Sequence, residues 1–260
     1  MANAETTHAL RTLAIDVGGS GLKMMTLGPF GEPLNERVRR LTPKPATPSA
    51  VLAELEAMIV GQPHFDRVAA GFPGVVSSGV TMTAVNLHPA WVGFDFGAAL
   101  SAMTGAPARV ANDADVQGLA VIEGVGTELV LTLGTGLGSA LYVDGRLVPN
   151  LEIAHHVFCE DRTYEDYLGV AALNRLGKRR WNGLLQEAVC QLRAAFNFHR
   201  LYIGGGNARR VREPLPEDVR LVSNRAGLLG CIHLWGAAMA RGGASEPRTA
   251  EVVVAAALAQ

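Results

Sequence analysis

Three glycine-rich turns, each directly after a short apolar run, constrain the fold of this chain more than any other feature. Residues 13–17, 128–133 and 201–203 each run into such a turn. Apolar runs of this length that end in glycine are typical of buried strands. Because the turns occur in both halves of the chain, we expect two α/β units of similar construction that face each other across a cleft.

The rest of the chain alternates strand and helix patterns. Glycine allows backbone angles that other residues resist, so the first two turns each predict a strand–turn–strand unit. We expect further strands at residues 22–27, 34–41, 68–72, 108–111 and up to Val143, and helices at residues 49–60, 113–123, 184–196 and 226–240. Asp95 is a good helix N-cap and Gly105 a good stop signal, which predicts one more helix between them.

The glycine turns are candidate phosphate sites, because exposed backbone N–H groups in such a turn attract phosphate oxygens. The alternative is ordinary glycine hairpins, since none of the turns fits the Walker pattern or the dinucleotide fingerprint. Asp16 could also hold magnesium through water. The candidate phosphate-binding residues are Asp16, Gly18, Gly19, Ser20, Gly21 and Lys23 in the first turn and Gly134, Thr135, Gly136 and Gly138 in the second. The candidate nucleotide-binding residues are Gly204, Gly205 and Gly206 in the third turn.

Composition excludes several classes of protein. The 260 residues carry a formal net charge of −1, which predicts neither a nucleic-acid nor a membrane partner. No apolar stretch reaches the roughly 18 residues of a membrane span, and the polar start has no signal core, so we expect a cytoplasmic protein. Cys159, Cys190 and Cys231 match no disulfide framework or metal-ligand spacing.

Several motifs occur in an order that resembles a known family. They are Asp16–Lys23, Gly71-Phe-Pro-Gly74, Asn112-Asp113-Ala114-Asp115, Leu133–Ser139, Glu152–His155 and Gly204–Gly206. This pattern is similar to the ROK family of sugar kinases and sugar-responsive repressors, in particular its polyphosphate glucokinase branch. The resemblance implies an α/β fold of two ribonuclease-H-like (actin-like ATPase) domains, with mixed sheets that face a central cleft, and a homodimer. We place the domains at residues 1–115 and 116–260, with the last helix packing back on the first domain.

The resemblance also implies a hexose site. Asp113 would be the catalytic base, and Asn86, Asn112, Glu152 and His155 would bind the sugar. The alternative for Asp113 is that it only caps the helix that follows. Trp91 could wall the sugar pocket or lie in the core.

Two departures from the family pattern concern the segment after Glu152. Ala154 stands where relatives carry glycine, so a methyl group replaces a hydrogen at a position where we expect the backbone to need freedom. Many relatives bind zinc with the histidine and a downstream cysteine cluster, whereas only Cys159 lies near His155 here. We therefore expect no zinc, and a surface position for His156.

The donor is indicated by charge. Between Arg175 and Arg212 there are nine Lys or Arg residues and one acid, Glu187, which leaves a net charge of +8, with Lys178, Arg179 and Arg180 densest. Such a run is a solvated helix face or a surface that gathers a polyanion. It favours inorganic polyphosphate as phosphoryl donor, with ATP or GTP as competitor or co-donor and Mg²⁺ as cofactor.

Other functions stay open on the sequence. The chain could be a sugar-binding regulatory protein without kinase activity, or an ATP-only kinase for another hexose or an amino sugar. Only about twelve residues precede Leu13 in this sequence, too few for the DNA-binding domain of a repressor.

Overall fold

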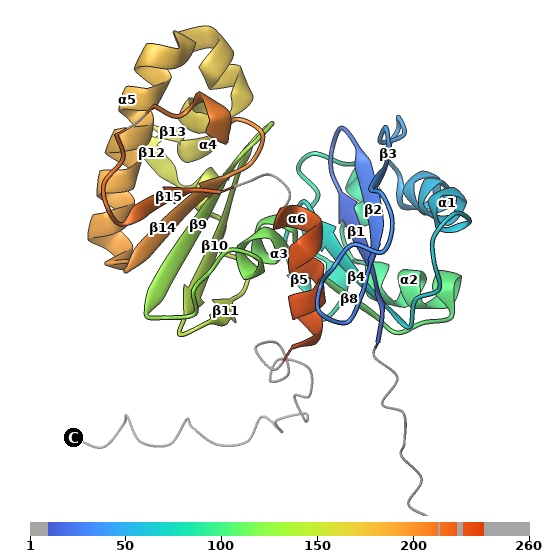
Figure 1. The fold of residues 1–260 in the computed structure, drawn as a ribbon. Coiled ribbons are helices and arrows are strands. Elements are labelled where there is room, and N and C mark those ends of the chain that lie inside the picture. The colour runs from blue at the N-terminus through green and yellow to red at the C-terminus, as the bar shows by residue number, and fades with distance from the viewer. Residues whose placement is uncertain (1–9, 213, 223–225, 237–260) are drawn as a thin grey trace, which may run out of the picture.

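The computed structural model describes residues 10–212, 214–222 and 226–236, and it contains two five-stranded mixed sheets (Figure 1). The first sheet has the order β3-β2-β1-β4-β8. Its strands are β1 (Thr12–Val17), β2 (Leu22–Leu27), β3 (Val38–Arg40), β4 (Arg67–Phe72) and β8 (Ala108–Asn112). β1, β2 and β3 form antiparallel pairs, and β4 and β8 add to β1 in parallel.

The second sheet repeats this plan with the order β11-β10-β9-β14-β15. It consists of β9 (Thr127–Leu133), β10 (Leu137–Val143), β11 (Arg146–Val148), β14 (Arg200–Gly204) and β15 (Val219–Leu221). β10 pairs antiparallel with β9 and with β11, whereas β14 pairs in parallel with β9 and β15 in parallel with β14. The shared plan confirms the predicted fold class, with two strand–glycine turn–strand units that open equivalent sheets.

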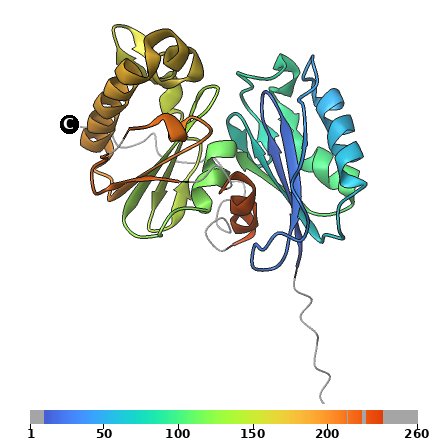
Figure 2. The same ribbon diagram turned by 45° about the horizontal axis from the view of Figure 1, so that its top comes forward.

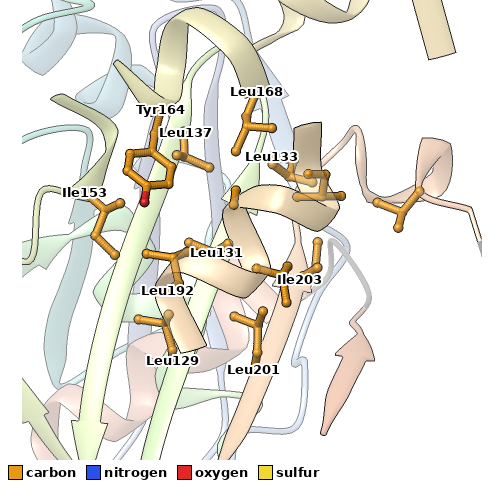
Figure 3. Close-up of a cluster of buried hydrophobic side chains, with 14 of the residues drawn as sticks. Leu129, Leu131, Leu133, Leu137, Ile153, Tyr164, Leu168, Leu192, Leu201 and Ile203 are labelled. Carbon is orange, nitrogen blue, oxygen red and sulfur yellow. The ribbon is translucent and has the colours of Figure 1, made fainter. Parts of the chain in front are cut away.

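Helices cover the outer faces of both sheets (Figure 1). α1 (Pro48–Ile59) and α2 (Phe96–Thr104) pack on the first sheet, and the long α5 (Val170–Phe196) packs on the second. The side-chain alternation of a strand explains this layering. Leu13 and Ile15 of β1 face α1 and α2, whereas Ala14 between them belongs to the cluster that lies between the sheets. The cluster under α5 is drawn in Figure 3.

Short elements complete the chain. They are β5 (Val76–Ser77), β6 (Val80–Thr81) and β7 (Phe94–Asp95) in one small sheet, β12 (Val157–Cys159) and β13 (Arg162–Thr163) in another, α4 (Tyr164–Leu168), and the 3₁₀ helices η1 (Pro89–Trp91), η2 (Ile153–His155) and η3 (Ala208–Arg210).

Two segments lie between the sheets (Figures 1 and 2). One is α3 (Asp113–Leu119), and the other is α6 (Ala226–Leu229) with the 3₁₀ helix η4 (Gly230–Trp235). The C-terminal segment contacts the first sheet, because Arg109 Nη1 donates to the carbonyl oxygen of Leu234 at 2.6 Å. A domain boundary after residue 115 falls inside α3, and the division into residues 1–115 and 116–260 stays a prediction.

Several predicted elements need correction. The strand expected at residues 34–41 is only β3, and the helix expected at residues 113–123 ends at Leu119. The last helix is one turn, α6, followed by 3₁₀ structure, and the part predicted at residues 237–240 lies outside the described residues. The helix expected at residues 184–196 begins at Val170, with non-helical angles at Gly177 (φ 74°, ψ 160°). Asp95 and Gly105 cap α2 as predicted.

Trp91 belongs to the core and not to the wall of a pocket. Its side chain is fully buried, and its ring lies 5.0 Å from that of Phe72 and 5.1 Å from that of Phe96. Its indole N–H donates to the carbonyl oxygen of Ala46 at 2.9 Å, so the buried polar group is satisfied. Within the described part of the chain, no helix is both long and apolar enough to cross a bilayer.

Candidate active site

A cavity of about 580 Å³ lies between the two sheets and brings nearly all the predicted site residues together. All three glycine turns reach it, as do the starts of α3 and of η2. Two predicted residues are exceptions, because Gly21 and Gly204 do not line the cavity. The predicted residues in the lining are Asp16, Gly18, Gly19, Ser20, Lys23, Asn86, Asn112, Asp113, Gly134, Thr135, Gly136, Gly138, Glu152, His155, Gly205 and Gly206.

The first turn joins β1 to β2, and the backbone N–H of Gly18 donates to the carbonyl oxygen of Gly21 at 3.1 Å. At the end of β1, Asp16 is 8% exposed, and Lys23 Nζ lies 2.6 Å from its Oδ2. This ion pair compensates the buried carboxylate. The glycines serve a different purpose from the one expected, because none of Gly18, Gly19 and Gly21 has a positive φ. They allow close approach instead: a Cβ on Gly19 would lie 3.2 Å from Asn86, so Asn86 would have to shift slightly for any larger residue.

The second and third turns are bonded to each other. The side-chain amide of Asn207 donates to the carbonyl oxygen of Gly134 at 2.8 Å. The backbone N–H of Asn207 donates to the carbonyl oxygen of Leu133 at 2.9 Å. Gly205 has φ +84°, and a Cβ there would lie 2.4 Å from the carbonyl oxygen of Leu133. Only glycine fits this position, so the third turn is shaped to dock on the second.

Asn112 and Asp113 stand where β8 passes into α3. Asn112 Oδ1 accepts from the backbone N–H of Ala114 at 2.8 Å and of Asp115 at 3.3 Å, so Asn112 is the N-cap. The alternative role expected for Asp113, capping, is therefore taken by its neighbour. Burial raises the pKa of Asp113 to about 7, and the negative charges of Asp16 and Glu152 add to the shift. A carboxyl with this pKa can accept a proton near neutral pH.

Glu152 and His155 lie on the segment that follows β11. Asn112 Nδ2 is 3.4 Å from Glu152 Oε1, and His155 Nε2 is 3.7 Å from Glu152 Oε2. Burial raises the pKa of Glu152. Ala154 is buried and has no positive φ, so this departure from the family pattern causes no backbone strain. His156 is exposed, as predicted, with its ring 6.4 Å from that of Tyr164.

Six polar residues of the cavity were not predicted: Thr83, Gln117, Thr132, Glu165, Asn207 and Arg209. Glu165 Oε2 accepts from the backbone N–H of Leu137 at 3.0 Å, and a Cβ on Gly136 would collide with this carboxylate. Gln117 lies one turn after Asp113 on α3, a spacing that the sequence already contained. Arg209 lies on η3, directly after the third turn, and Glu165 lies in the first turn of α4. Neither residue belongs to a sequence pattern that predicts a site.

Two equivalent sheets, with glycine turns and a buried carboxyl facing one cavity, define the actin-like ATPase class of two-lobed α/β proteins. The ROK family model matches residues 12–152 of the chain. The polyphosphate glucokinase of Mycobacterium tuberculosis (strain CDC 1551 / Oshkosh) is 32% identical over 241 residues, which cover 87% of this chain and 89% of the relative. The polyphosphate glucokinase of Mycobacterium leprae (strain TN) is 31% identical over 254 residues, which cover 91% of this chain and 76% of the relative.

A solved structure agrees with these sequence matches. The crystal structure of inorganic polyphosphate/ATP-glucomannokinase from Arthrobacter sp. strain KM superposes with a TM-score of 0.77 at 32% identity, over 86% of this chain and 97% of that one. The chain belongs to the ROK family.

Proposed function

We propose that this protein is a glucokinase of the ROK family, which transfers the terminal phosphoryl group of polyphosphate or ATP to the 6-hydroxyl of glucose or a similar hexose. One observation carries the proposal: Asp113, with a pKa raised to about 7, shares a cavity with the three glycine turns. The named activities of relatives 31–32% identical over most of the chain support the same reaction.

In this reaction Asp113 takes the proton of the sugar hydroxyl as the hydroxyl oxygen attacks the terminal phosphorus. The new oxygen–phosphorus bond forms as the bond to the donor's bridging oxygen breaks, and the shortened donor leaves with that electron pair. Asn86, Asn112, Glu152 and His155 hold the hexose, since a buried hydroxyl without a partner costs about 1–3 kcal/mol. The backbone N–H groups of the glycine turns, with Lys23, hold the phosphates.

Magnesium fits the carboxylates present. Across residues 10–212, 214–222 and 226–236, no three His, Cys, Asp or Glu side chains gather as a protein-only metal site. Magnesium bound with substrate phosphates needs only one or two protein carboxylates, however, and Asp16 lines the cavity beside Asp113. Magnesium would neutralise phosphate charge during transfer. The expected absence of zinc stays a prediction.

Polyphosphate as donor is supported by a basic surface that leads out of the cavity. Arg209 lines the cavity, and the exposed Arg210 and Arg212 follow it in the chain. The buried side chain of Asn182 joins this segment to α5: its Nδ2 donates to the carbonyl oxygens of Lys178 at 2.8 Å and Arg210 at 3.1 Å, and its Oδ1 accepts from Arg212 N at 2.7 Å. Residues 210–212 are therefore bonded to the part of α5 that carries Lys178, Arg179 and Arg180.

The start of this part of α5 also suits an anion. The break at Gly177 makes Lys178, Arg179 and Arg180 the first residues of a new helical segment, and all three are exposed. Backbone N–H groups at a helix start favour phosphate. We expect a long polyphosphate to extend from the cavity to these cations, and ATP, with its short phosphate chain, to contact fewer of them.

The family resemblance further supports a cytoplasmic location and a homodimer. Light scattering on the purified protein tests the homodimer. The proposed activity is tested by a coupled assay of hexose 6-phosphate formation, with glucose, mannose and amino sugars as acceptors and with polyphosphate, ATP and GTP as donors. We expect glucose to be phosphorylated from polyphosphate and from ATP. Sugar binding without phosphorylation by any donor would instead identify a sugar-binding regulatory protein.

A further inference from the structure

The side-chain amide of Asn150 bonds to a strand that belongs to the other lobe. Its Oδ1 accepts from the backbone N–H of Val76 at 3.0 Å, and its Nδ2 donates to the carbonyl oxygen of Val76 at 3.0 Å. Asn150 follows β11 of the second sheet, and Val76 begins β5, which follows β4 of the first. One side chain thus satisfies both backbone polar groups of a residue 74 positions away in the chain.

Asparagine suits this position for two independent reasons. Its backbone has φ 62°, in the left-handed region that asparagine and glycine tolerate best. Its amide carries both a donor and an acceptor, as pairing with a backbone N–H and C=O requires. An aspartate here would lack the donor, and a glycine would lack both groups.

The segment around Asn150 is also anchored to the second sheet. Ser139 of β10 accepts from the backbone N–H of Ile153 at 3.1 Å and donates to the carbonyl oxygen of Leu151. The backbone N–H of Asn150 also donates to Oδ2 of Asp115 at 3.4 Å. Asp115 lies on α3 and is only 2% exposed. Because the segment is held from behind, the amide of Asn150 sets the position of β5 relative to the second sheet.

Both ends of this contact lead to the sugar side of the cavity. Glu152 follows Asn150 by two residues, and Gly74 precedes Val76 by two. They meet at Asn112, whose Nδ2 lies 3.1 Å from the carbonyl oxygen of Gly74 and 3.4 Å from Glu152 Oε1. All three residues line the cavity.

We propose that Asn150 is a positioning residue for the hexose. Its amide clamps β5 to the segment that carries Glu152, and so keeps the sugar-binding groups of the two lobes at the spacing one hexose requires. The inference rests on the proposed hexose site, but not on phosphoryl transfer. Asn150 itself touches neither sugar nor phosphate in this role.

The test uses Asn150→Gly, which keeps the left-handed backbone and removes both amide bonds. Asn197→Gly is the matched control, because Asn197 is exposed and also left-handed (φ 45°), at the end of α5. We expect Asn150→Gly to raise the hexose KM and the hexose Kd from calorimetry about tenfold, as the loss of two hydrogen bonds allows. The donor KM should change less than about twofold, and the control should change none of these values.

Hydrogen exchange at the Val76 amide tests whether the bond to Asn150 forms in solution, without any assay of activity. This amide should be protected in the parent protein and should exchange faster in Asn150→Gly. An unprotected Val76 amide in the parent protein would overturn the clamp, even if the variant failed to fold. Faster exchange with an unchanged hexose Kd, or equal rises in hexose and donor KM, would overturn its role at the sugar site. Calorimetry without donor separates these outcomes from a failure of the proposed kinase activity.

Discussion

Asn112 Oδ1 lies 2.8 Å from the backbone nitrogen of Ala114, so the cap of α3 is an amide and the neighbouring carboxyl of Asp113 lines the cavity. Asn112 fills the role that an aspartate at a helix start often has. Asp113 is thereby left to act on a substrate. Burial, with the negative charges of Asp16 and Glu152 beside it, keeps the pKa of Asp113 high.

The first prediction concerns activity and pH. The pKa of Asp113 is raised to about 7, and a general base must be deprotonated to accept the hydroxyl proton. The kcat/KM for hexose should therefore rise with pH, with an inflection near 7, and fall about tenfold per pH unit well below it. A profile of initial rates from about pH 5 to pH 8 measures this. A rate that stays constant down to about pH 5 would argue against Asp113 as the base.

The second prediction concerns stability and Asp115. Burial raises the pKa of Asp115 from its ordinary value of about 4 to about 7, and no partner is found for its Oδ1 among the described residues. The folded state then holds a proton that the unfolded chain releases, so this contribution to stability is present below about pH 4 and is lost as pH rises through 7. Asp115→Asn should show a smaller loss of unfolding free energy between about pH 5 and pH 8 than the parent protein.

Urea denaturation at both pH values measures that difference. Asp161→Asn is the control, because Asp161 is exposed and its left-handed backbone (φ 59°) accepts asparagine. The control should follow the parent protein. An equal pH dependence in Asp115→Asn and the parent would contradict a buried carboxyl that stays protonated up to neutral pH.

The third prediction concerns the donor. Replacing Lys178, Arg179 and Arg180 together by Gln should raise the polyphosphate KM more than the ATP KM and leave kcat largely unchanged, because binding shared by ground and transition states is lost. In the parent enzyme, polyphosphate-driven turnover at subsaturating donor should fall more steeply with salt than ATP-driven turnover, since the Debye length is about 8 Å near physiological ionic strength.

A control for net charge replaces three exposed arginines outside residues 175–212, Arg11, Arg37 and Arg146, by Gln. It should leave the ratio of the two KM values unchanged. Equal effects of the α5 variant on both donors would identify Lys178, Arg179 and Arg180 as a solvated helix face.

Local patterns predicted the glycine turns and the strands around them, because those features depend on neighbouring residues. They also placed Asp95 and Gly105 at the ends of α2. The same patterns misjudged the backbone of the first turn: Gly19 has no positive φ and instead allows the close approach of Asn86, a contact between segments almost seventy residues apart. Long-range packing of this kind leaves no local signal.

The cavity residues that the sequence did not predict also depend on long-range packing. Arg209 and Glu165 enter the cavity only because the third turn docks on the second and because α4 packs beside it. Trp91 stands a few residues after Asn86 in the chain, yet the packing of Phe72 and Phe96 places it in the core. The first 14 residues of α5 escaped prediction because Gly177 and a run of basic residues interrupt its apolar periodicity.

The most direct test of the proposed chemistry is the turnover of Asp113→Asn at saturating hexose and donor, measured as hexose 6-phosphate formed per enzyme. The substitution keeps the shape of the side chain and removes its ability to take a proton. We predict a loss of about 10²–10⁴-fold, the usual contribution of a general base, with a hexose Kd that changes less than about threefold. A variant that retains near-full turnover would contradict Asp113 as the base of this reaction.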